Sequence, residues 1–219
     1  MERLNKDSEA RHFLDTRVIP IVRGVASEHV YLLANALYNG GIRAMEITMN
    51  TENAPQMITA LRTQFAERMW IGAGTVLTMG EAKSALEAGA QFFVTPNVDL
   101  SIIEFAVENN LHTLTGAMTP SEIVTAYENG ASAVKVFPIR SLGSSYIRDL
   151  QGPMGHIPLI AVGGVSVDNA AEYFQSGCVG IGVGGSLVNR KLIEVGDFAR
   201  IQQVASRFIE IARQNAVSN

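Results

Sequence analysis

A lysine stands in the middle of an apolar stretch at residues 131–138, which read ASAVKVFP. Such a stretch is typical of a buried strand, and burying an ammonium group is costly unless the group is paired or loses its proton. An amine held in an apolar interior has a lowered pKa and becomes a nucleophile. The chemistry that uses such an amine is Schiff-base formation with a carbonyl compound. Lys135 is therefore a candidate catalytic residue.

A carboxylate in a second apolar stretch could serve the same reaction. Glu46 lies within AMEITMN at residues 44–50. A glutamate near a Schiff base can carry protons to and from the reacting atoms. The residue types alone fit a structural ion pair between Lys135 and Glu46 equally well, so both interpretations stay open here.

These two stretches belong to a series of short apolar segments that alternate with amphipathic ones. The candidate strands cover residues 18–23, 44–50, 70–75, 92–97, 112–116, 133–138, 159–164 and 179–184. The candidate helices cover residues 27–39, 53–67, 79–88, 99–109, 120–129, 144–151, 168–175 and 197–214. A strand that is followed each time by a helix indicates a parallel sheet.

Eight such units predict an α/β fold, a (β/α)8 TIM barrel, as a single domain over residues 1–219. The alternative is an open, doubly wound parallel sheet. Residues 2–15 predict an extra N-terminal helix before the first strand. Thr119, Pro120 and Glu122 have the pattern of a capping box at the start of one helix.

Side-chain alternation predicts which residues of each strand point inward. Alternate residues of a strand share a face, and in a closed barrel one face lines the interior. This puts Lys135 inside with Phe137, and Glu46 inside with Asn50. The same argument predicts interior rows of Ile19, Ile21 and Arg23 in the first strand and of Ile71, Ala73 and Thr75 in the third.

The carboxyl ends of the strands form the catalytic face of such barrels, so Arg23, Asn50 and Thr75 are expected in one cavity with Lys135. Plainer interpretations exist for several of these residues. Arg23 could cap the Lys–Glu pair, Thr75 could be a turn residue, and Phe137 could belong to the ordinary core.

Two pairs of glycines follow the last two candidate strands, in VGGV at residues 162–165 and VGGS at residues 183–186. In (β/α)8 barrels these two loops often hold a phosphate, because glycine lets backbone N–H groups approach an anion. The pattern therefore predicts a phosphate site. Tight turns without a ligand are the alternative.

The composition excludes several classes of function. The chain has 17 Lys and Arg against 21 Asp and Glu, a net charge of −4, and no basic cluster, which argues against nucleic-acid binding. Its single cysteine, Cys178, rules out an internal disulfide and fits a reducing cytoplasm. The four histidines are scattered, so no metal site is expected. No apolar run approaches a membrane span, and the charged first residues do not fit a secretion signal.

Taken together, the motifs resemble a known family, the class I aldolases of the 2-keto-3-deoxy-6-phosphogluconate and 4-hydroxy-2-oxoglutarate type. The resemblance covers about residues 14–212. Its motifs are IPIVRG (19–24), GGIRAMEIT (40–48), GAGTVLT (72–78), FFVTPN (92–97), TGAMTPSE (115–122), VKVFP (134–138), AVGGV (161–165) and GVGGSLV (182–188).

The resemblance implies a role for each candidate residue. Lys135 would form the Schiff base, and Glu46 would move protons through a water. Arg23 and Thr75 would surround the pyruvoyl carboxylate, while Pro96 and Phe137 would wall the cavity. The phosphate would lie at Gly163, Gly164, Gly184, Gly185 and Ser186. The family implies no metal, no cofactor, a homotrimer, and pyruvate and a phosphorylated keto-deoxy sugar acid as ligands.

Some positions depart from the phosphogluconate pattern. Many of those enzymes have Arg where this chain has Asn50, Thr where it has Val162, and PG where it has Thr115 and Gly116. Asn50, VTPN at residues 94–97 and AVGG at residues 161–164 look more like the branch acting on 2-keto-3-deoxy-6-phosphogalactonate, the C4 epimer. A phosphate-binding barrel isomerase and a non-catalytic binder of sugar-acid phosphates are the remaining alternatives, and neither requires an interior lysine.

Overall fold

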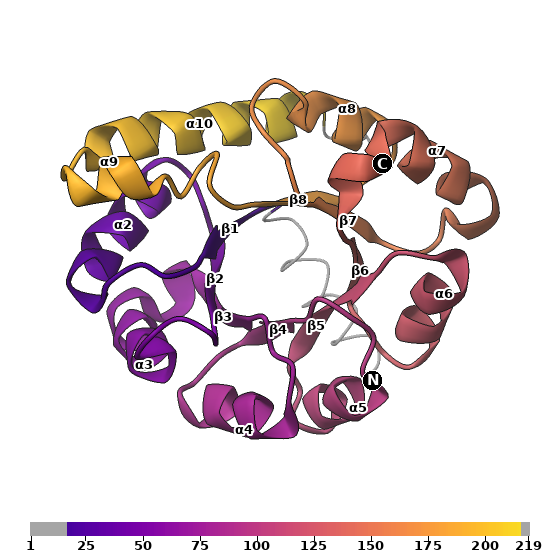
Figure 1. Cartoon of the computed structure of the whole chain (residues 1–219), viewed down its shortest axis with the longest axis horizontal. Helices are drawn as coiled ribbons and strands as arrows, with labels where there is room; N and C mark the ends of the chain where they lie inside the picture. Colours follow the sequence, from indigo (N-terminus) through magenta and orange to yellow (C-terminus); the bar gives the residue numbers. More distant parts are fainter. Residues whose placement is uncertain (1–16, 216–219) are drawn as a thin grey trace.

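The computed structural model describes residues 17–215, which form one closed barrel of parallel strands surrounded by helices (Figure 1). The strands are β1 (Val18–Val22), β2 (Ala44–Thr48), β3 (Trp70–Gly74), β4 (Phe92–Val94), β5 (His112–Ala117), β6 (Ala133–Val136), β7 (Leu159–Val162) and β8 (Gly180–Val183). The α-helices are α2 (Ser27–Asn39), α3 (Ala54–Phe65), α4 (Met79–Glu87), α5 (Leu100–Glu108), α6 (Pro120–Glu128), α7 (Gly143–Met154), α8 (Ala170–Gln175), α9 (Arg190–Glu194) and α10 (Phe198–Gln214). Two short 3-10 helices are η1 (Ala66–Arg68) and η2 (Ile139–Ser141).

The predicted (β/α)8 barrel is confirmed, and the open sheet is excluded. Each strand pairs in parallel with the next, and β8 pairs with β1, where Val18 lies opposite Ile181. A last strand paired with the first leaves no sheet edge. The predicted N-terminal helix at residues 2–15 lies outside the described residues.

The apolar core has two layers, as a barrel requires. Residues such as Ile47 and Val134 belong to a large layer between the strands and the helices. A smaller layer fills the barrel interior and includes Ile19, Phe92 and Ile160. Glu46 and Lys135 alternate with Ile47 and Val134 along their strands, so both point inward as predicted.

The interior row predicted for the third strand is wrong. Ile71 and Ala73 pack in the outer layer, and the inward positions of β3 are glycines. A Cβ on Gly72 would lie 2.5 Å from the Phe92 ring, and one on Gly74 would lie 2.6 Å from the carboxyl carbon of Glu46. Glycine is required there because β3 must leave room for two inward side chains from its neighbours.

Local signals start several helices. The predicted capping box is confirmed: the Thr119 hydroxyl accepts from the Glu122 N–H, and the Glu122 carboxylate accepts from the Thr119 N–H. Thr78 and Glu81 form a second capping box at the start of α4. Helix α9 was not predicted, since five residues are too few for a periodic pattern.

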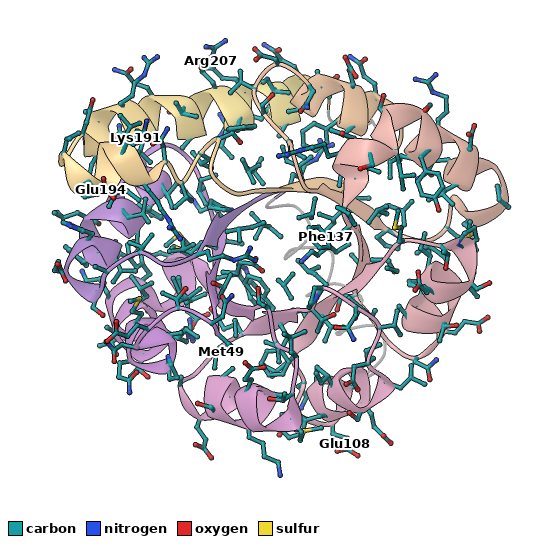
Figure 2. All side chains as sticks on the ribbon, viewed as in Figure 1. Met49, Glu108, Phe137, Lys191, Glu194 and Arg207 are labelled. Carbon is teal, nitrogen blue, oxygen red and sulfur yellow. The ribbon has the colours of Figure 1, made fainter. Side chains whose placement is uncertain are left out.

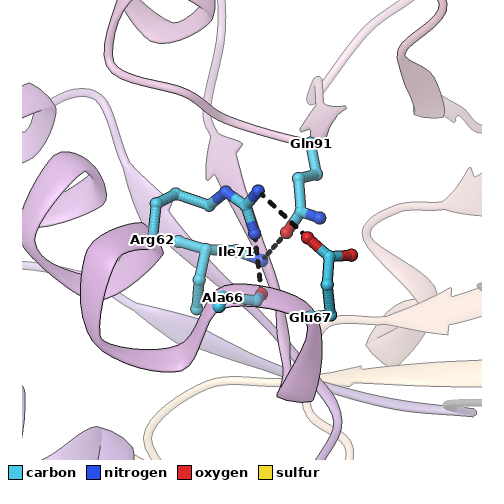
Figure 3. A network of polar contacts seen from close by, with 5 residues as sticks. All are labelled: Arg62, Ala66, Glu67, Ile71 and Gln91. Carbon is cyan, nitrogen blue, oxygen red and sulfur yellow. Dashed lines mark hydrogen bonds and ion pairs between the residues drawn. The ribbon is translucent and has the colours of Figure 1, made fainter.

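A polar network supports the amino end of β3, at the opposite end of the barrel from the carboxyl ends of the strands (Figure 3). Gln91 accepts a hydrogen bond from the Ile71 N–H at 3.0 Å, and Arg62 donates to the Ala66 carbonyl at 2.9 Å. Arg62 also reaches Glu67 at 4.0 Å. These contacts satisfy backbone groups at the edge of the barrel without touching the site.

The described residues include neither a membrane-spanning helix nor a metal centre. None of the helices between residues 17 and 215 is long and apolar enough to cross a membrane. Within the same residues, no group of His, Cys, Asp and Glu side chains could hold a metal ion.

Candidate active site

A cavity of about 1070 Å³ opens at the carboxyl ends of the strands. Every predicted site residue except Glu46 lines it: Arg23, Asn50, Thr75, Pro96, Lys135, Phe137, Gly163, Gly164, Gly184, Gly185 and Ser186. Figure 2 shows Phe137 within the ring of strands and Lys191 on α9, outside that ring; both residues line the cavity. The parallel strands thus bring together residues from all parts of the chain, as expected of a barrel.

Lys135 is the buried cation of this cavity. Its side chain is 5% exposed, and Nζ lies 4.8 Å from the centre of the Phe137 ring. Burial lowers the pKa of Lys135; the Glu46 carboxylate opposes this shift, and the positive charge of Arg23 adds to it. The amine is therefore easier to deprotonate than an ordinary lysine.

Glu46 lies deeper in the barrel, 2% exposed. Burial raises its pKa to about 7, although Lys135 and Arg23 both pull it down. Among the described residues, its Oε2 atom has no hydrogen-bond partner. A small cavity of about 10 Å³ is lined by Glu46 and shares Ile21, Lys135 and Val162 with the large one. Space of this size is about what one water molecule occupies.

Lys135 and Glu46 do not form an ion pair, which weighs against a purely structural salt bridge. Arg62 and Glu67, by contrast, do form an ion pair. Each of the two buried groups still shifts the pKa of the other. A buried charge without an ion-pair partner lowers the stability of the fold. Buried groups with shifted pKa values are concentrated at functional sites.

Arg23 and Thr75 meet at the cavity wall, where Arg23 donates a hydrogen bond of 3.1 Å to the Thr75 hydroxyl. Thr75 reaches the cavity because its φ of 54° breaks the alternation of β3. A β-branched residue in this left-handed region is strained. Arg190 donates to the Arg23 carbonyl at 3.1 Å and packs against Gly24, so it holds the end of β1 in place.

The two glycine loops present unpaired backbone donors to the cavity. Within the described part of the chain, the following N–H groups have no hydrogen-bond acceptor: Gly164, Val165, Gly184, Gly185 and Ser186. The loops are joined to each other, because the Ser186 hydroxyl donates to the Val165 carbonyl at 2.5 Å. Asn169 holds the first loop by accepting from Ser166 and donating to the Gly164 carbonyl.

The fold itself does not require glycine at positions 184 and 185. A Cβ there would meet nothing within 4 Å, and neither residue has a left-handed backbone. What a side chain would occupy at Gly184 and Gly185 is the cavity. The tight-turn alternative therefore does not explain these two glycines, whereas the approach of a ligand to the backbone does.

The sequence reasoning missed several residues of this cavity, among them the cations Arg140, Arg190 and Lys191. They lie in η2 and α9, which carry no periodic pattern. Val162 is the inward residue at the end of β7, and a Cβ on Gly182 would lie 2.7 Å from one of its methyl groups. The inward alternation of β7 was the signal that could have placed Val162 in the site.

Comparison with known proteins agrees with this geometry. The protein-family model for KDPG and KHG aldolase matches residues 10–204. This chain belongs to the KDPG and KHG aldolase family. A family member from Escherichia coli K12, 2-dehydro-3-deoxy-6-phosphogalactonate aldolase, is 33% identical over 199 residues, or 90% of this chain and 95% of that one. The 2-dehydro-3-deoxy-phosphogluconate aldolase of Treponema pallidum strain Nichols is 36% identical over 197 residues, or 89% and 93% of the two chains.

Solved structures of the aldolase family share the fold. The structure described as native KDPGal superposes with a TM-score of 0.85 at 32% identity, covering 90% of this chain and 95% of that one. The KDPG aldolase of Legionella pneumophila, with pyruvate captured as a covalent carbinolamine, gives a TM-score of 0.81 at 26% identity over 87% and 92%. The present chain is accordingly a class I aldolase, a lyase that forms a Schiff base and yields pyruvate.

Proposed function

We propose that this aldolase cleaves 2-keto-3-deoxy-6-phosphogalactonate to pyruvate and glyceraldehyde 3-phosphate, with Lys135 as the Schiff-base residue. The observation that carries the proposal is the buried, unpaired Lys135 beneath a cavity rich in cations and backbone donors. The KHG/KDPG aldolase of Escherichia coli is 32% identical to this chain, and 4-hydroxy-2-oxoglutarate is a second candidate substrate, giving pyruvate and glyoxylate.

The first half of the reaction uses the neutral amine of Lys135. Its lowered pKa makes that form easier to reach than in an ordinary lysine, and the amine attacks the keto carbon to give a carbinolamine. Glu46, acting through a water in the small cavity, protonates the departing hydroxyl. Loss of water leaves an iminium ion, which can accept an electron pair.

The second half breaks the carbon–carbon bond. Glu46, again through a water, takes the proton of the C4 hydroxyl, and the C3–C4 electron pair moves into the iminium. Glyceraldehyde 3-phosphate leaves, and the enamine that remains is protonated at C3 and hydrolysed to pyruvate and free Lys135. A carboxyl with a pKa of about 7 suits both directions of proton transfer.

The remaining site residues hold the substrate. In this proposal Arg23, which donates a hydrogen bond to Thr75, binds the pyruvoyl carboxylate. The unpaired N–H groups of the two glycine loops suit the phosphate. Phe137 and Pro96 wall the cavity between them. Holding both ends of the substrate orients the C3–C4 bond over Lys135.

The deciding experiment is reduction of the enzyme with borohydride in the presence of pyruvate, followed by peptide mapping of the adduct. We expect the adduct on Lys135 and none on Lys191, the other lysine that lines the large cavity. Lys135→Ala should be folded, unlabelled and inactive. Turnover by purified Lys135→Ala would reject Lys135 as the Schiff-base residue. The absence of any adduct on folded wild-type protein would favour an isomerase or a binding protein instead.

Val162 and Asn50, which line the cavity, support the proposed preference for the phosphogalactonate epimer. Neither provides the hydroxyl or guanidinium found in many phosphogluconate enzymes. We expect a higher kcat/KM on the phosphogalactonate than on the phosphogluconate, and a shift toward the latter in Val162→Thr. A preference for phosphogluconate by the wild-type enzyme would reject this assignment.

Two further parts of the proposal concern the protein in the cell. The family resemblance supports a homotrimer, which light scattering on the purified protein would test against a monomer. The single cysteine supports a cytoplasmic location, which cell fractionation would test.

A further inference from the structure

Arg140 lies beside the glycine loops, although no sequence motif pointed to it. It belongs to η2, directly after the strand that carries Lys135, and lines the large cavity. Its side chain packs against Gly164: a Cβ there would lie 2.5 Å from Arg140 Nε and 3.1 Å from its Cβ and Cγ. The guanidinium is thus held next to a loop whose N–H groups are unpaired.

The guanidinium of Arg140 has no partner among the described residues. Within residues 17–215 it has no hydrogen bond, ion pair or ring contact, whereas Arg23 donates to Thr75 and Arg190 donates to the Arg23 carbonyl. Lys191 lines the same cavity from α9. No Asp or Glu is among the described residues around this large cavity. Its mouth therefore favours an anion of more than one negative charge.

We propose that Arg140 is a specificity-determining residue that binds the phosphate of the substrate through its side chain. Arginine suits this role because its planar fork can give two parallel, charge-assisted hydrogen bonds to phosphate oxygens. Arg140 would add to the backbone donors of Gly164 and Gly185 and make the enzyme discriminate against substrates without a phosphate. This inference rests on the proposed aldolase function and names what selects its substrate class.

The kinetic test compares Arg140→Gln with Arg148→Gln. Arg148 is an exposed arginine of the adjacent helix α7 that does not line the cavity, so the two variants lose the same charge. We expect Arg140→Gln to lower kcat/KM on the 6-phosphorylated substrate about 10- to 100-fold, mainly through KM. Activity on unphosphorylated 4-hydroxy-2-oxoglutarate should stay within about twofold, and Arg148→Gln should match wild type on both.

Direct binding keeps this test separate from the aldolase assignment. Calorimetric titration with inorganic phosphate should give weaker binding for Arg140→Gln than for wild type and Arg148→Gln. Arg140→Lys should bind with intermediate affinity, because it keeps the charge and loses the planar fork. This measurement does not depend on Schiff-base chemistry. If the wild-type enzyme formed no pyruvate adduct, the proposed function would be rejected, but the role of Arg140 in phosphate binding could still be measured.

Three results would overturn the role of Arg140. The first is an equal loss of kcat/KM on phosphorylated and unphosphorylated substrates. The second is an unchanged phosphate affinity in Arg140→Gln. The third is an equal effect of Arg148→Gln, which would mean that Arg140 acts only through the overall charge of the protein. Circular dichroism of each variant excludes misfolding as the cause of any loss.

Discussion

Lys135 and Glu46 have pKa values that burial moves toward each other. The pKa of the amine falls and that of the carboxyl rises to about 7. Glu46 can therefore exchange protons near neutral pH, which an ordinary glutamate cannot, and the Lys135 amine loses its proton more readily than an ordinary lysine. The absence of direct contact between them leaves the amine open to a substrate carbonyl.

The pH dependence of activity follows from these two shifts. As the pH decreases below about 7, Glu46 becomes protonated and cannot accept the C4 proton, so kcat/KM should decrease. Lower pH also favours the ammonium form of Lys135, which cannot attack. Glu46→Gln should lower kcat by about 100-fold or more. It should also move the acid limb to lower pH, because the carboxylate raises the pKa of Lys135.

The measurement is a profile of kcat/KM against pH on one substrate, for wild type and Glu46→Gln, with the fold checked at each pH. An acid limb that stays in place in the variant would assign the titration to another group.

Thr75 offers a second test on the scale of one residue. Its left-handed φ of 54° is strained for a β-branched side chain, at a cost of about 1–3 kcal/mol. Thr75→Gly should relieve this strain while adding chain entropy to the unfolded state, worth about 0.5–1 kcal/mol. We expect an unchanged or higher melting temperature and a lower kcat/KM, since Arg23 loses its partner.

Thermal unfolding and kinetics on the same preparation separate the two effects. Thr75→Ser, which keeps the hydroxyl, should retain most of the activity. A clear drop in melting temperature with Thr75→Gly would show that the hydroxyl serves the fold rather than the substrate.

Residue-level prediction from the sequence succeeded where strands are regular. Alternation placed Glu46 and Lys135 in the interior because β2 and β6 are uniformly extended and buried on both faces. It failed in β3, where Thr75 is in the cavity through an unusual φ and not through parity. It could not find Arg140, since the position of a side chain in a non-repeating loop depends on tertiary contacts.

On the scale of elements, the loops after β7 and β8 form the candidate phosphate site. Gly184→Ala should leave stability unchanged, because a Cβ meets nothing within 4 Å. It should raise KM for phosphorylated substrates, because the methyl group enters the cavity. Gly164→Ala should destabilise the protein by about 1–3 kcal/mol, since its φ is +80° and a Cβ would meet Arg140.

Chemical denaturation and KM measured on the two variants give this comparison. Loss of stability in Gly184→Ala, or an unchanged KM for phosphorylated substrate, would contradict the proposed use of these loops.

The order of the strands and helices could be predicted from the sequence, but the residues at which they end could be predicted less well. The alternation of apolar and amphipathic segments indicated all eight strands, although α3 and α5 end without a glycine. Strand β4 ends at Val94, three residues before the predicted end, because the Thr95 hydroxyl donates to the Asn97 carbonyl and turns the chain. Pro96 lines the cavity from this turn and not from a strand.

On the scale of the whole molecule, Arg17 joins the seam where the barrel closes. It donates to the Val179 carbonyl before β8 and to the Ala212 and Asn215 carbonyls of the last helix turn. Its guanidinium also lies 4.6 Å from the centre of the Phe174 ring. One side chain therefore ties the first strand to the last strand and to helices α8 and α10.

Arg17→Ala should lower the free energy of unfolding by about 2–4 kcal/mol, because it removes several hydrogen bonds from a charged donor. The kcat of the folded variant should stay near wild type, since Arg17 lies at the opposite end of β1 from Arg23. Urea denaturation and kinetics below the unfolding transition measure the two quantities. A strong loss of kcat in folded Arg17→Ala would mean that the seam also shapes the site.

The close fit of Val162 against Gly182 restricts how substrate preference can change in evolution. A Cβ at position 182 would lie 2.7 Å from a Val162 methyl group, so substitutions at the two positions are epistatic. Threonine has nearly the shape of valine and can replace Val162 without disturbing its neighbour. Threonine at position 162 is therefore reachable by one substitution, whereas a bulkier side chain at either position requires a change at both.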